Sequence, residues 1–360
     1  MSNTPYILAI HRGLRLTYPR FQKLKSHFQN DWEKAFKSDL KHWIEAGIDK
    51  KGLEKWFVNK HTIDPAKELQ KLQNCGAQLL CCDDPEFPLA LQHIANPPAI
   101  LLVRGPLKEN DWPSVSVVGS RKISQYGKRA IAKILTPICQ ANITIVSGLA
   151  YGTDTLAHQI ALQNNTRTIA VLGNGIDYIY PTANESLAKK IMTNGAIVSE
   201  FLPGTKARPE YFPVRNRIVA GLSQGTVIVE AAQKSGSLIT ADYAIEFGRE
   251  VFALPGEIFN PNAAGTNQLL RDGAHCALSG EQILSTLGIK ATNKSTKIDL
   301  PTTGIESEII KSLTVQKSYH IDEIIRLCGF PNTTVNSHLM LMEMKGWIKN
   351  LGGQMYVRNI

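Results

Sequence analysis

Six short apolar segments rich in β-branched residues, each followed by a stretch of helical character, constrain the fold of this chain more than any other feature. Most of these segments end in glycine or serine. Fully apolar strands of this length that alternate with helices are typical of a parallel sheet covered on both faces. The sequence therefore predicts a doubly wound α/β domain. The six segments are VSVVGS (115–120), ITIVSG (143–148), TIAVLG (168–173), AIVSE (196–200), TVIVEA (226–231) and VFALPG (251–256).

The residues before this domain, 1–78, show helical periodicity without strand signals. They predict a small basic helical domain in which Trp32, Trp43 and Trp56 are core anchors. Residues 46–56 have a helix–glycine–helix rhythm that fits either a contact with a DNA backbone or a plain structural turn. The helical stretches are 16–28, 31–37, 40–48 and 64–76.

The residues after the α/β domain predict a second small domain. Residues 288–303 are polar and lysine-bearing, which indicates a linker. Residues 304–360 then contain three helical stretches and two short strands around the turn Gly352–Gly353. Three helices followed by a hairpin predict a winged helix-turn-helix. The α/β domain itself is expected to span residues 79–287.

Composition limits the cellular setting of the chain. No stretch approaches the roughly 20 apolar residues of a membrane span, so we expect no membrane insertion. The first residues break their apolar run early and offer no small-residue cleavage site, which argues against a signal peptide. The six cysteines form no CxxC pair or disulfide-like framework. A reducing cytoplasm is the simplest expectation, and a zinc site is not expected.

The net charge of +9 suggests a polyanionic partner, but its distribution decides where that partner can bind. Lysine and arginine outnumber aspartate and glutamate by 14 to 8 in residues 1–80 and by 9 to 6 in residues 288–360. In residues 81–287 the two classes are equal at 17 each. Binding of nucleic acid by the α/β domain must therefore rest on local clusters. The clearest is KARPEYFPVRNR (206–217), whose cations alternate with aromatic residues beside a predicted strand.

Four turns at the carboxyl ends of the predicted strands carry glycines, small hydroxyl residues and helix starts. Ligands of open α/β sheets bind at this edge, and the backbone N–H groups of such turns bind anions. One such turn is usually only structural, but four on one edge predict a line of phosphates. Two of the turns and the neighbouring segment also supply cations and an asparagine. The predicted contact residues are Gly119, Ser120, Arg121, Ser147, Gly148, Gly152, Gly173, Gly175, Arg215, Asn216, Arg217, Lys234, Ser235, Gly236 and Ser237.

Enzymatic readings find little support in the motifs. The chain has no GxxxxGK[ST], no GxSxG and no HExxH, and GNGIDY fails the last position of GxGxxG. His158 falls on a predicted helix and is expected to pack or cap. Asp154 fits a helix-start residue and a ligand contact equally well.

Together, the segments VVGSRKISQYG, VSGLAYGTDTLAH, AVLGNGIDYIYP, FPVRNRIVAGLS, EAAQKSGSLITADYA and LPGEIFNPNAAGTNQLLRDGA strongly resemble the DprA/Smf family of bacterial DNA-processing proteins. The resemblance covers about residues 80–285 and implies an extended Rossmann-like fold. The flanks resemble, less specifically, the sterile-alpha-motif-like domain and the winged helix of family members.

The resemblance implies a protein that is not an enzyme and needs no cofactor. It implies binding and protection of single-stranded DNA during natural transformation, loading of the RecA recombinase, and a homodimer formed through the Rossmann-like domain. Single-strand binding protein is a further expected partner. The family's DNA-contacting cations correspond to Arg121, Arg215, Arg217 and Lys234, whereas Lys206 and Arg208 lie in a less regular stretch.

Single-strand binding needs a cationic path and surfaces on which bases stack. Tyr151, Tyr211 and Phe212 are candidate stacking partners or simple packing aromatics, and Asn216 is expected to brace its loop. A competing interpretation is a nucleotide-binding or nucleotide-hydrolysing Rossmann-like enzyme with a PGGxGTxxE motif, but Leu269 stands at the glutamate position. A third, transcriptional regulation, is weaker because the predicted recognition helix is poor in cations.

Overall fold

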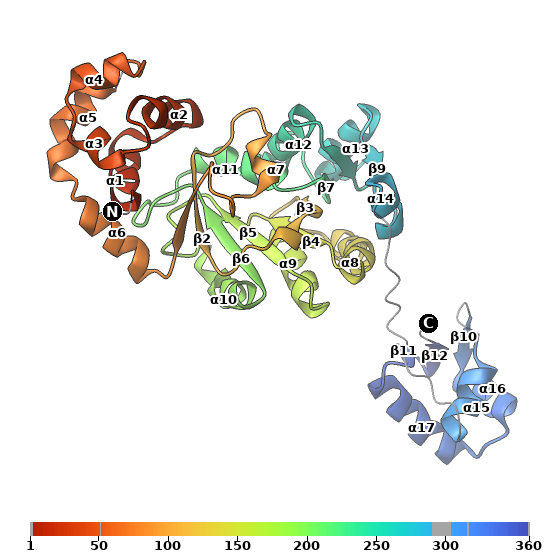
Figure 1. The fold of residues 1–360 in the computed structure, drawn as a ribbon. Coiled ribbons are helices and arrows are strands. Elements are labelled where there is room, and N and C mark those ends of the chain that lie inside the picture. The colour runs from red at the N-terminus through yellow and green to blue at the C-terminus, as the bar shows by residue number, and fades with distance from the viewer. Residues whose placement is uncertain (1–2, 51, 290–303, 315–316, 359–360) are drawn as a thin grey trace. The chain divides into compact units, whose positions relative to one another are not determined.

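A computed structural model describes residues 3–50, 52–289, 304–314 and 317–358 of the chain (Figure 1). The chain divides into two compact units, Met1–Thr292 and Asn293–Ile360. Most of the predicted linker, residues 290–303, lies outside the described residues. Among the described residues, no helix has the length and apolar character needed to cross a membrane.

The first unit begins with a helical region, and its described residues before Gln78 form helices and no strand, as predicted. Trp32, Trp43 and Trp56 are buried as predicted, and they share one core cluster with the adjoining face of the sheet. The sequence prediction missed the first helix because its apolar run was assessed only as a signal segment. The elements are α1 (Thr4–Leu14), α2 (Tyr18–His27), α3 (Trp32–Lys37), α4 (Leu40–Glu45), α5 (Leu53–Asn59), η1 (Lys60–Thr62) and α6 (Pro65–Asn74).

The sheet of this unit has the strand order β1-β2-β6-β5-β4-β3-β7-β8-β9. Strands β3 to β9 run parallel, which confirms the doubly wound α/β prediction, and all six predicted segments contain a strand. The strands are β1 (Gln78–Cys81), β2 (Ile100–Arg104), β3 (Ser114–Val118), β4 (Thr144–Ser147), β5 (Thr168–Leu172), β6 (Gly195–Ser199), β7 (Gly225–Ile228), β8 (Glu250–Ala253) and β9 (His275–Cys276).

Two strands at one edge of the sheet were not predicted. Strand β2 pairs antiparallel with both β1 and β6, so the sheet is mostly, not entirely, parallel. Gly105 follows β2 directly, but only the four-residue helix α7 follows β1 and only the 3-10 turn η2 follows β2, so the alternation of strand and crossover helix that identified the other strands is missing here.

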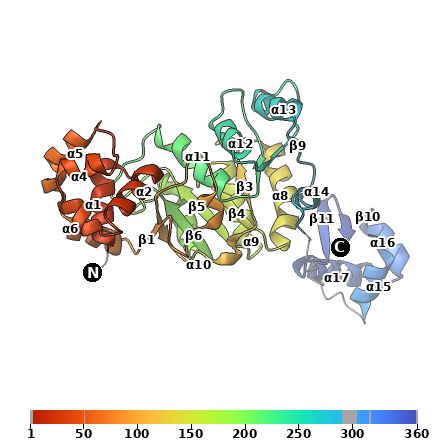
Figure 2. The same ribbon diagram turned by 45° about the horizontal axis from the view of Figure 1, so that its top comes forward.

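Helices cover both faces of the sheet (Figures 1 and 2). Alternate side chains of a strand point to opposite faces. In β3, Val115 and Val117 pack with α8, α9 and α14, whereas Val118 belongs to the core on the side of α11 and α12. The helices are α7 (Leu89–Gln92), α8 (Gln125–Gln140), α9 (Thr153–Gln163), α10 (Glu185–Thr193), α11 (Tyr211–Gly221), α12 (Gly236–Glu246), α13 (Ala264–Arg271) and α14 (Gly280–Thr286), with 3-10 turns η2 (Glu109–Asp111), η3 (Thr182–Asn184) and η4 (Pro261–Ala263).

The second unit is the predicted winged helix, with its own core of buried side chains that includes Ile309, Leu339 and Ile348. A short strand, β10, joins the predicted hairpin in the order β10-β12-β11. Its elements are α15 (Ile305–Ser312), β10 (Ser318–His320), α16 (Ile321–Cys328), α17 (Asn332–Met344), β11 (Ile348–Gly352) and β12 (Met355–Arg358).

Candidate nucleic-acid interface

The loops after β3, β4 and β7 meet at the carboxyl edge of the sheet, because these strands are neighbours in the order β4-β3-β7. The backbone N–H and the hydroxyl of Thr153 both donate to the carbonyl of Ser120, at 3.1 Å each. Gly152, with φ of 74°, packs so closely that a Cβ there would collide with the carbonyl oxygens of Ser120 and Arg121. These contacts fix the first and second predicted turns to each other.

Arg215 is buried beneath this edge and binds backbone instead of facing solvent. Its guanidinium donates to the carbonyl of Gly148 at 2.7 Å and to that of Val171, so it joins the ends of β4 and β5. The close approach explains Gly148, where a Cβ would lie 2.5 Å from the guanidinium carbon. Burial lowers the Arg215 pKa to about 10, and Asp154 opposes the shift. The side chain therefore stays charged at neutral pH.

Asn216 connects Arg215 to a third loop, as its predicted bracing role requires. Its side-chain oxygen accepts from Nε of Arg215 at 3.1 Å, and its Nδ2 donates to the carbonyl of Gly236 at 3.1 Å. Gly236 begins α12, where Ser235 caps the helix by accepting from the N–H of Ser237. Helix α11 thus ties the ends of β4 and β5 to the turn that carries Lys234.

Asp154 is a structural partner of the same loop. Its Oδ2 accepts from the N–H groups of Gly148 at 3.1 Å and Ala150 at 3.3 Å. Burial raises the Asp154 pKa, and the nearby Arg215 charge opposes that rise. These contacts favour the helix-start role over a ligand contact.

Arg217 points elsewhere. Its guanidinium pairs with the buried carboxylate of Glu200 at 2.6 Å, and Arg15 from the helical region reaches the other oxygen of Glu200 at 3.4 Å. The predicted set of cations is therefore divided between an ion cluster at Glu200 and the loops after β3, β4 and β7.

Among the residues that the sequence predicted on the loops after β3, β4 and β7, the exposed cations and ring are Arg121, Lys234 and Tyr151. The Arg121 guanidinium carbon lies 5.7 Å from the ring centre of Phe212, and that of Arg215 lies 5.9 Å from the same ring. The side chain of Tyr151 is 51% exposed and makes no ring contact with the described residues. These three side chains present two charges and one open aromatic surface to solvent.

The sequence prediction missed Tyr180, which is exposed and lies 5.8 Å from Phe212 between ring centres. Phe212 rests over Gly173, where a Cβ would come within 2.7 Å of the ring. Tyr211, the other aromatic of this turn, is stacked on Phe201 at 4.5 Å. Of the three predicted stacking candidates, Tyr151 has the most open ring.

Other predicted glycines and serines serve close packing. A Cβ on Gly119 would lie 2.8 Å from the Thr153 hydroxyl, and the Ser147 hydroxyl donates to the carbonyl of Val117 at 2.6 Å. Gly175 belongs to a different turn, in which its N–H donates to Thr205 at 2.8 Å. Their contribution to a ligand is through the shape of the loops.

Glu230, which the sequence prediction also missed, occupies the start of α8 at the point between β3 and β7. Its carboxylate accepts from the backbone N–H of Ser124 at 3.0 Å and from the Ser124 hydroxyl. Dinucleotide-binding Rossmann proteins place a pyrophosphate at this helix N-terminus, next to the point where the strand order reverses. Here a buried carboxylate fills that position, and it repels phosphate.

His158 is packed, as expected. Its Nδ1 lies 2.7 Å from the Thr168 hydroxyl, which already donates to the carbonyl of Ile145, so Nδ1 carries the proton. Burial lowers the His158 pKa to about 3. A neutral, enclosed imidazole with this pKa is unsuited to proton transfer at neutral pH.

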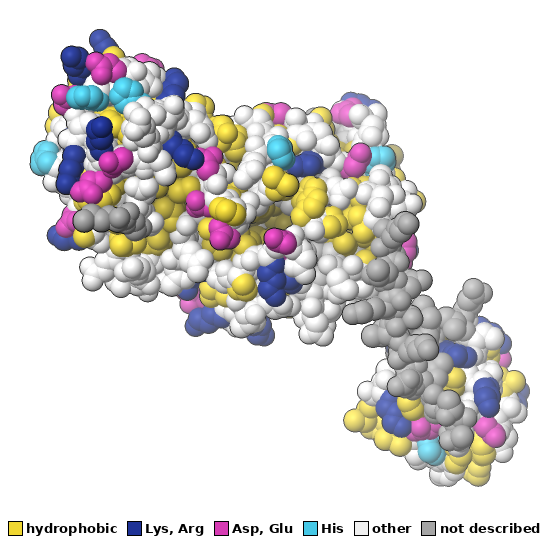
Figure 3. Space-filling view, in the orientation of Figure 1, with side chains coloured by type: hydrophobic (Ala, Val, Ile, Leu, Met, Phe, Trp, Pro, Cys, Tyr) yellow, Lys and Arg dark blue, Asp and Glu magenta, His cyan; other side chains and the backbone are white. Residues whose placement is uncertain are grey.

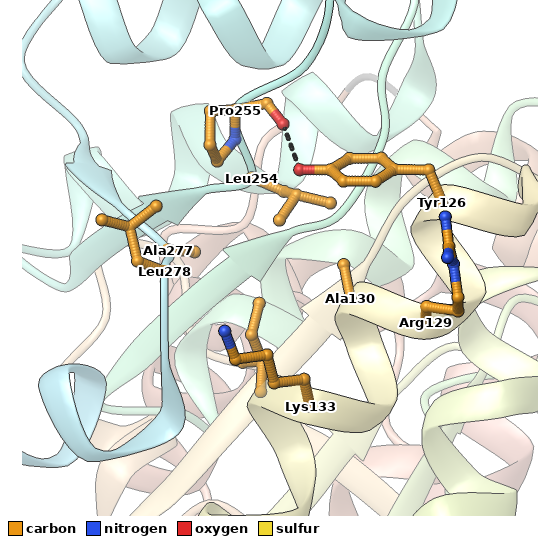
Figure 4. A pocket seen from close by; sticks show the side chains of 9 residues that line it. Tyr126, Arg129, Ala130, Lys133, Leu254, Pro255, Ala277 and Leu278 are labelled. Carbon is orange, nitrogen blue, oxygen red and sulfur yellow. Dashed lines mark hydrogen bonds between the residues drawn. The ribbon is translucent and has the colours of Figure 1, made fainter. Parts of the chain in front are cut away.

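A cavity of about 350 Å³ lies away from these loops, between α8 and the segments after β8 and β9 (Figure 4). Leu254, Ala277 and Leu278 line it, and Arg129 and Lys133 stand at its border. Tyr126 closes one side through a 2.8 Å hydrogen bond from its hydroxyl to the carbonyl of Pro255. Apolar lining dominates, which distinguishes this cavity from the cationic edge.

Charge on the helical region is mixed. In Figure 3, dark blue and magenta side chains alternate over the visible face of this region and form no continuous basic surface. The excess of cations in residues 1–80 therefore forms no continuous basic face on the side shown in Figure 3.

The fold is that of a Rossmann-like α/β protein with a C-terminal winged helix. A model of the DNA recombination-mediator protein A family matches residues 78–288, and a model of the DprA winged helix domain matches residues 295–354. The chain belongs to the DNA recombination-mediator protein A family, which confirms the DprA/Smf resemblance.

Named relatives agree with this membership. The chain is 42% identical over 246 residues to Protein Smf of Synechocystis, a match that covers 67% of this chain and 62% of the relative's length. It is 40% identical to the DNA processing protein DprA of Streptococcus pneumoniae, over 65% of this chain and 80% of the relative. Protein Smf of Escherichia coli is 34% identical over 89% of this chain and 90% of its own length.

Two solved structures share the fold. The X-ray structure of Streptococcus pneumoniae DprA has a TM-score of 0.69 and 33% identity, and the match covers 79% of this chain and 98% of that one. The DNA processing protein A of Helicobacter pylori has a TM-score of 0.53 and 31% identity, over 59% and 95% of the two chains. The Helicobacter structure is described as showing a single-stranded DNA binding mode.

Proposed function

We propose that this chain binds single-stranded DNA along the carboxyl edge of its sheet and delivers it to RecA during natural transformation. The observation that carries the proposal is the set of loops after β3, β4 and β7. They hold exposed Arg121, Lys234 and Tyr151 on a frame that buried Arg215 fastens to backbone. The family membership and the single-stranded DNA binding of the Helicobacter pylori relative support it.

In this proposal the predicted residues have three different roles: binding phosphates, shaping the path of the strand and positioning the loops. Arg121 and Lys234 attract phosphates, since an exposed guanidinium can hold two phosphate oxygens at once. The turns around Ser120, Gly152 and Gly236 shape the path, and their backbone N–H groups favour anions. Arg215 and Asn216 position those turns from beneath, and Arg217 anchors the adjoining segment through Glu200.

Bases stack on Tyr151, and the Phe212–Tyr180 pair offers a second aromatic surface beside Arg121. Stacking tolerates every base, so binding is expected to be independent of sequence. A paired duplex hides the faces of its bases, so the same edge is expected to prefer single strands.

The partners follow from family membership. We propose that the protein acts without catalysis or cofactor in the cytoplasm, loads RecA on strands covered by single-strand binding protein, and works as a homodimer through the Rossmann-like domain. Exposed apolar side chains on this domain, Ile258, Phe259 and Leu278, are of the kind that a partner protein covers. Pairing two DNA-binding edges raises the effective concentration along a long strand.

The test is RecA filament assembly on single strands coated with single-strand binding protein. Wild-type chain should shorten the lag of assembly, and Arg121→Glu with Lys234→Glu should not, although its circular dichroism stays native. Nucleotides incubated in parallel should stay intact. A nucleotide hydrolysis activity that mutation of the edge abolishes would favour the enzyme alternative, against which Glu230 already argues.

A further inference from the structure

We propose that the bound strand continues along the sheet edge past β6 toward the helical region, where Arg208, on the loop before α11, and Arg15, after α1, take further phosphates. This inference rests on the proposed function and extends its site. It starts from the order of the strands, because β6 and β5 lie beside β4 on the same sheet. With neighbouring strands about 5 Å apart, the edge from β7 to β6 is roughly 20 Å long.

A row of four side chains, here the Arg15–Arg208 row, lies at the β6 end of that edge. The guanidinium carbon of Arg15 is 5.5 Å from the ring centre of Phe201, and Phe201 stacks on Tyr211 at 4.5 Å. The guanidinium carbon of Arg208 is 6.0 Å from the ring centre of Tyr211. Tyr211 precedes Phe212, the aromatic beside Arg121, so the first turn of α11 joins the row to the proposed site.

The cations of the row are available to a ligand. Arg15 is 46% exposed, and its only carboxylate contact among the described residues is the 3.4 Å approach to Glu200. Glu200 lies closer to Arg217, at 2.6 Å, and is itself buried, so it neutralises Arg217 before Arg15. Arg208 is exposed and approaches Glu210 at a long 3.9 Å. The contact between exposed Arg208 and Glu210 contributes little, and the long approach to Glu200 leaves the Arg15 side chain half exposed, so both charges are free to bind phosphate.

The net charge around the Arg15–Arg208 row is positive, which favours binding of an anion. Lys206 is exposed on the same loop as Arg208, and Arg20 donates to the carbonyls of Leu14 and Arg15 next to the row. The opposing carboxylates are Glu200, Glu210 and Asp177, which accepts from the N–H of Gly204 on the same loop. With Arg217, five cations therefore stand against three acids.

The contacts also decide what the row binds. Phe201 is buried, and Tyr211 has Phe201 and Arg208 as neighbours, so neither ring offers the open face that Tyr151 has. The aromatic rings hold the guanidinium groups through cation–π contact, and the guanidinium groups are the binding elements. The ligand is therefore the phosphate backbone, not a base.

The backbone at Arg15 supports this role. Arg15 follows α1 with φ of 47° and ψ of 96°, a conformation that glycine adopts more easily. The arginine backbone is strained there, so the value of this residue lies in its side chain, which contacts Glu200 and Phe201 and has exposed donors for a phosphate. The same feature supplies a mild test variant, since Arg15→Gly removes the side chain and suits the backbone.

The experiment measures binding of labelled oligothymidylates from roughly 6 to 30 nucleotides, on the scale of known single-strand sites, by fluorescence anisotropy. We expect Arg15→Gly with Arg208→Ala to bind short strands like wild type but to lose about 5-fold to 10-fold in affinity for long ones. The slope of log affinity against log salt should shrink by about 1.4 on long strands, since each phosphate contact on a single strand contributes about 0.7.

The matched control is Lys41→Ala with Arg271→Ala, which removes the same charge from exposed positions outside the row. It should change neither the length dependence nor the slope. Arg15→Gly/Arg208→Ala chains that bind long strands as tightly as wild type would overturn the inference. The proposed function is tested separately in the same series by Arg121→Glu/Lys234→Glu, which should lose affinity at every length. Normal binding by that variant would overturn the proposed function.

Discussion

The sheet edge and the winged helix are both of types that bind nucleic acid, yet their exposed chemistry differs sharply. The edge presents Arg121, Lys234 and Tyr151 on loops fixed by buried hydrogen bonds. Helix α17, at the position of a recognition helix, exposes Met340, Leu341 and Met344 instead. Its nearest cation, Lys345, is paired with Glu306 at 2.9 Å.

The difference teaches that a fold motif does not by itself make a nucleic-acid surface. Attraction to phosphates requires cations with free access to solvent, and specific readout requires polar groups on the reading helix. Along its exposed face α17 passes from Asn332, Thr333 and Asn336 to methionines, and it carries no cation in its thirteen residues. Exposed methionines of this kind suit contact with a protein.

Removing the buried side chain of Arg215 should have the largest effect on stability. Arg215→Ala leaves Asp154 buried without its cation and leaves the carbonyls of Gly148 and Val171 without their donor. We expect the free energy of unfolding, measured by urea titration, to fall by about 3–5 kcal/mol, as when one partner of a buried pair is removed.

Arg121→Ala is the control, because Arg121 is exposed and its loss should change stability by less than about 0.5 kcal/mol. Adding Asp154→Asn to Arg215→Ala should recover part of the loss, since it removes the stranded charge. Equal unfolding free energies for wild type and Arg215→Ala would contradict the bracing role.

Acid should lower the free energy of unfolding of the first unit, because this unit contains two buried, neutral histidines. Burial lowers the pKa of His11 to about 4 and that of His158 to about 3. Below about pH 6.5 these two histidines are therefore protonated in the unfolded chain but remain neutral in the native chain. The stabilising contribution is complete above that pH and is lost as the pH falls toward 4, by about 2 kcal/mol per histidine at pH 5.

The measurement compares unfolding free energies at pH 7.5 and pH 5. His158→Gln should lose less stability on acidification than wild type, by about 2 kcal/mol. His27→Gln, at an exposed histidine, should behave as wild type. Identical acid sensitivity of wild type and His158→Gln would show that His158 is not buried in its neutral form.

Loss of the open aromatic at the edge should weaken binding moderately. Tyr151→Ala should lower single-strand affinity about 10-fold, within the range for one base–aromatic stack. Tyr151→Phe keeps the ring and should bind as wild type. If both variants lost affinity equally, the hydroxyl and not the ring would be the contact.

Deleting residues 291–360 should have the smallest effect on DNA. Because α17 exposes no cation, the truncated chain should keep its single-strand affinity within about 2-fold. Gel-filtration and circular dichroism establish that the remainder stays folded. A loss of orders of magnitude in a folded truncation would move the binding site to the winged helix and reverse the comparison.

The sequence predicted the parallel strands well because burial on both faces leaves a continuous apolar run followed by a turn. It missed β1 and β2, which pair antiparallel and are not followed by a crossover helix of ordinary length, and it missed the two-residue parallel strand β9. The winged helix was recognisable from three helical stretches and a Gly-Gly turn, and the added strand β10 is only three residues long.

For the site, the sequence predicted the loops but not the structural role of each residue within them. Arg215 and Arg217 stand two residues apart, yet one binds the carbonyls of Gly148 and Val171 and the other pairs with Glu200. Those partners come from other strands, and nothing local to FPVRNR identifies them. The same applies to Glu230, whose partner Ser124 is 106 residues away. Tertiary contacts determine which cations remain exposed to solvent, and these contacts cannot be predicted from any single motif.

The most direct test of the central claim is a salt-series titration of Arg121→Glu/Lys234→Glu against wild type, on single-stranded and double-stranded DNA of equal length. Wild type should prefer the single strand, and its log affinity should fall steeply with log salt. The variant should lose on the order of 100-fold in single-strand affinity at low salt and show a slope smaller by about 1.4, for two lost phosphate contacts. A natively folded variant with the affinity and salt slope of wild type would contradict the assignment of DNA binding to the sheet edge.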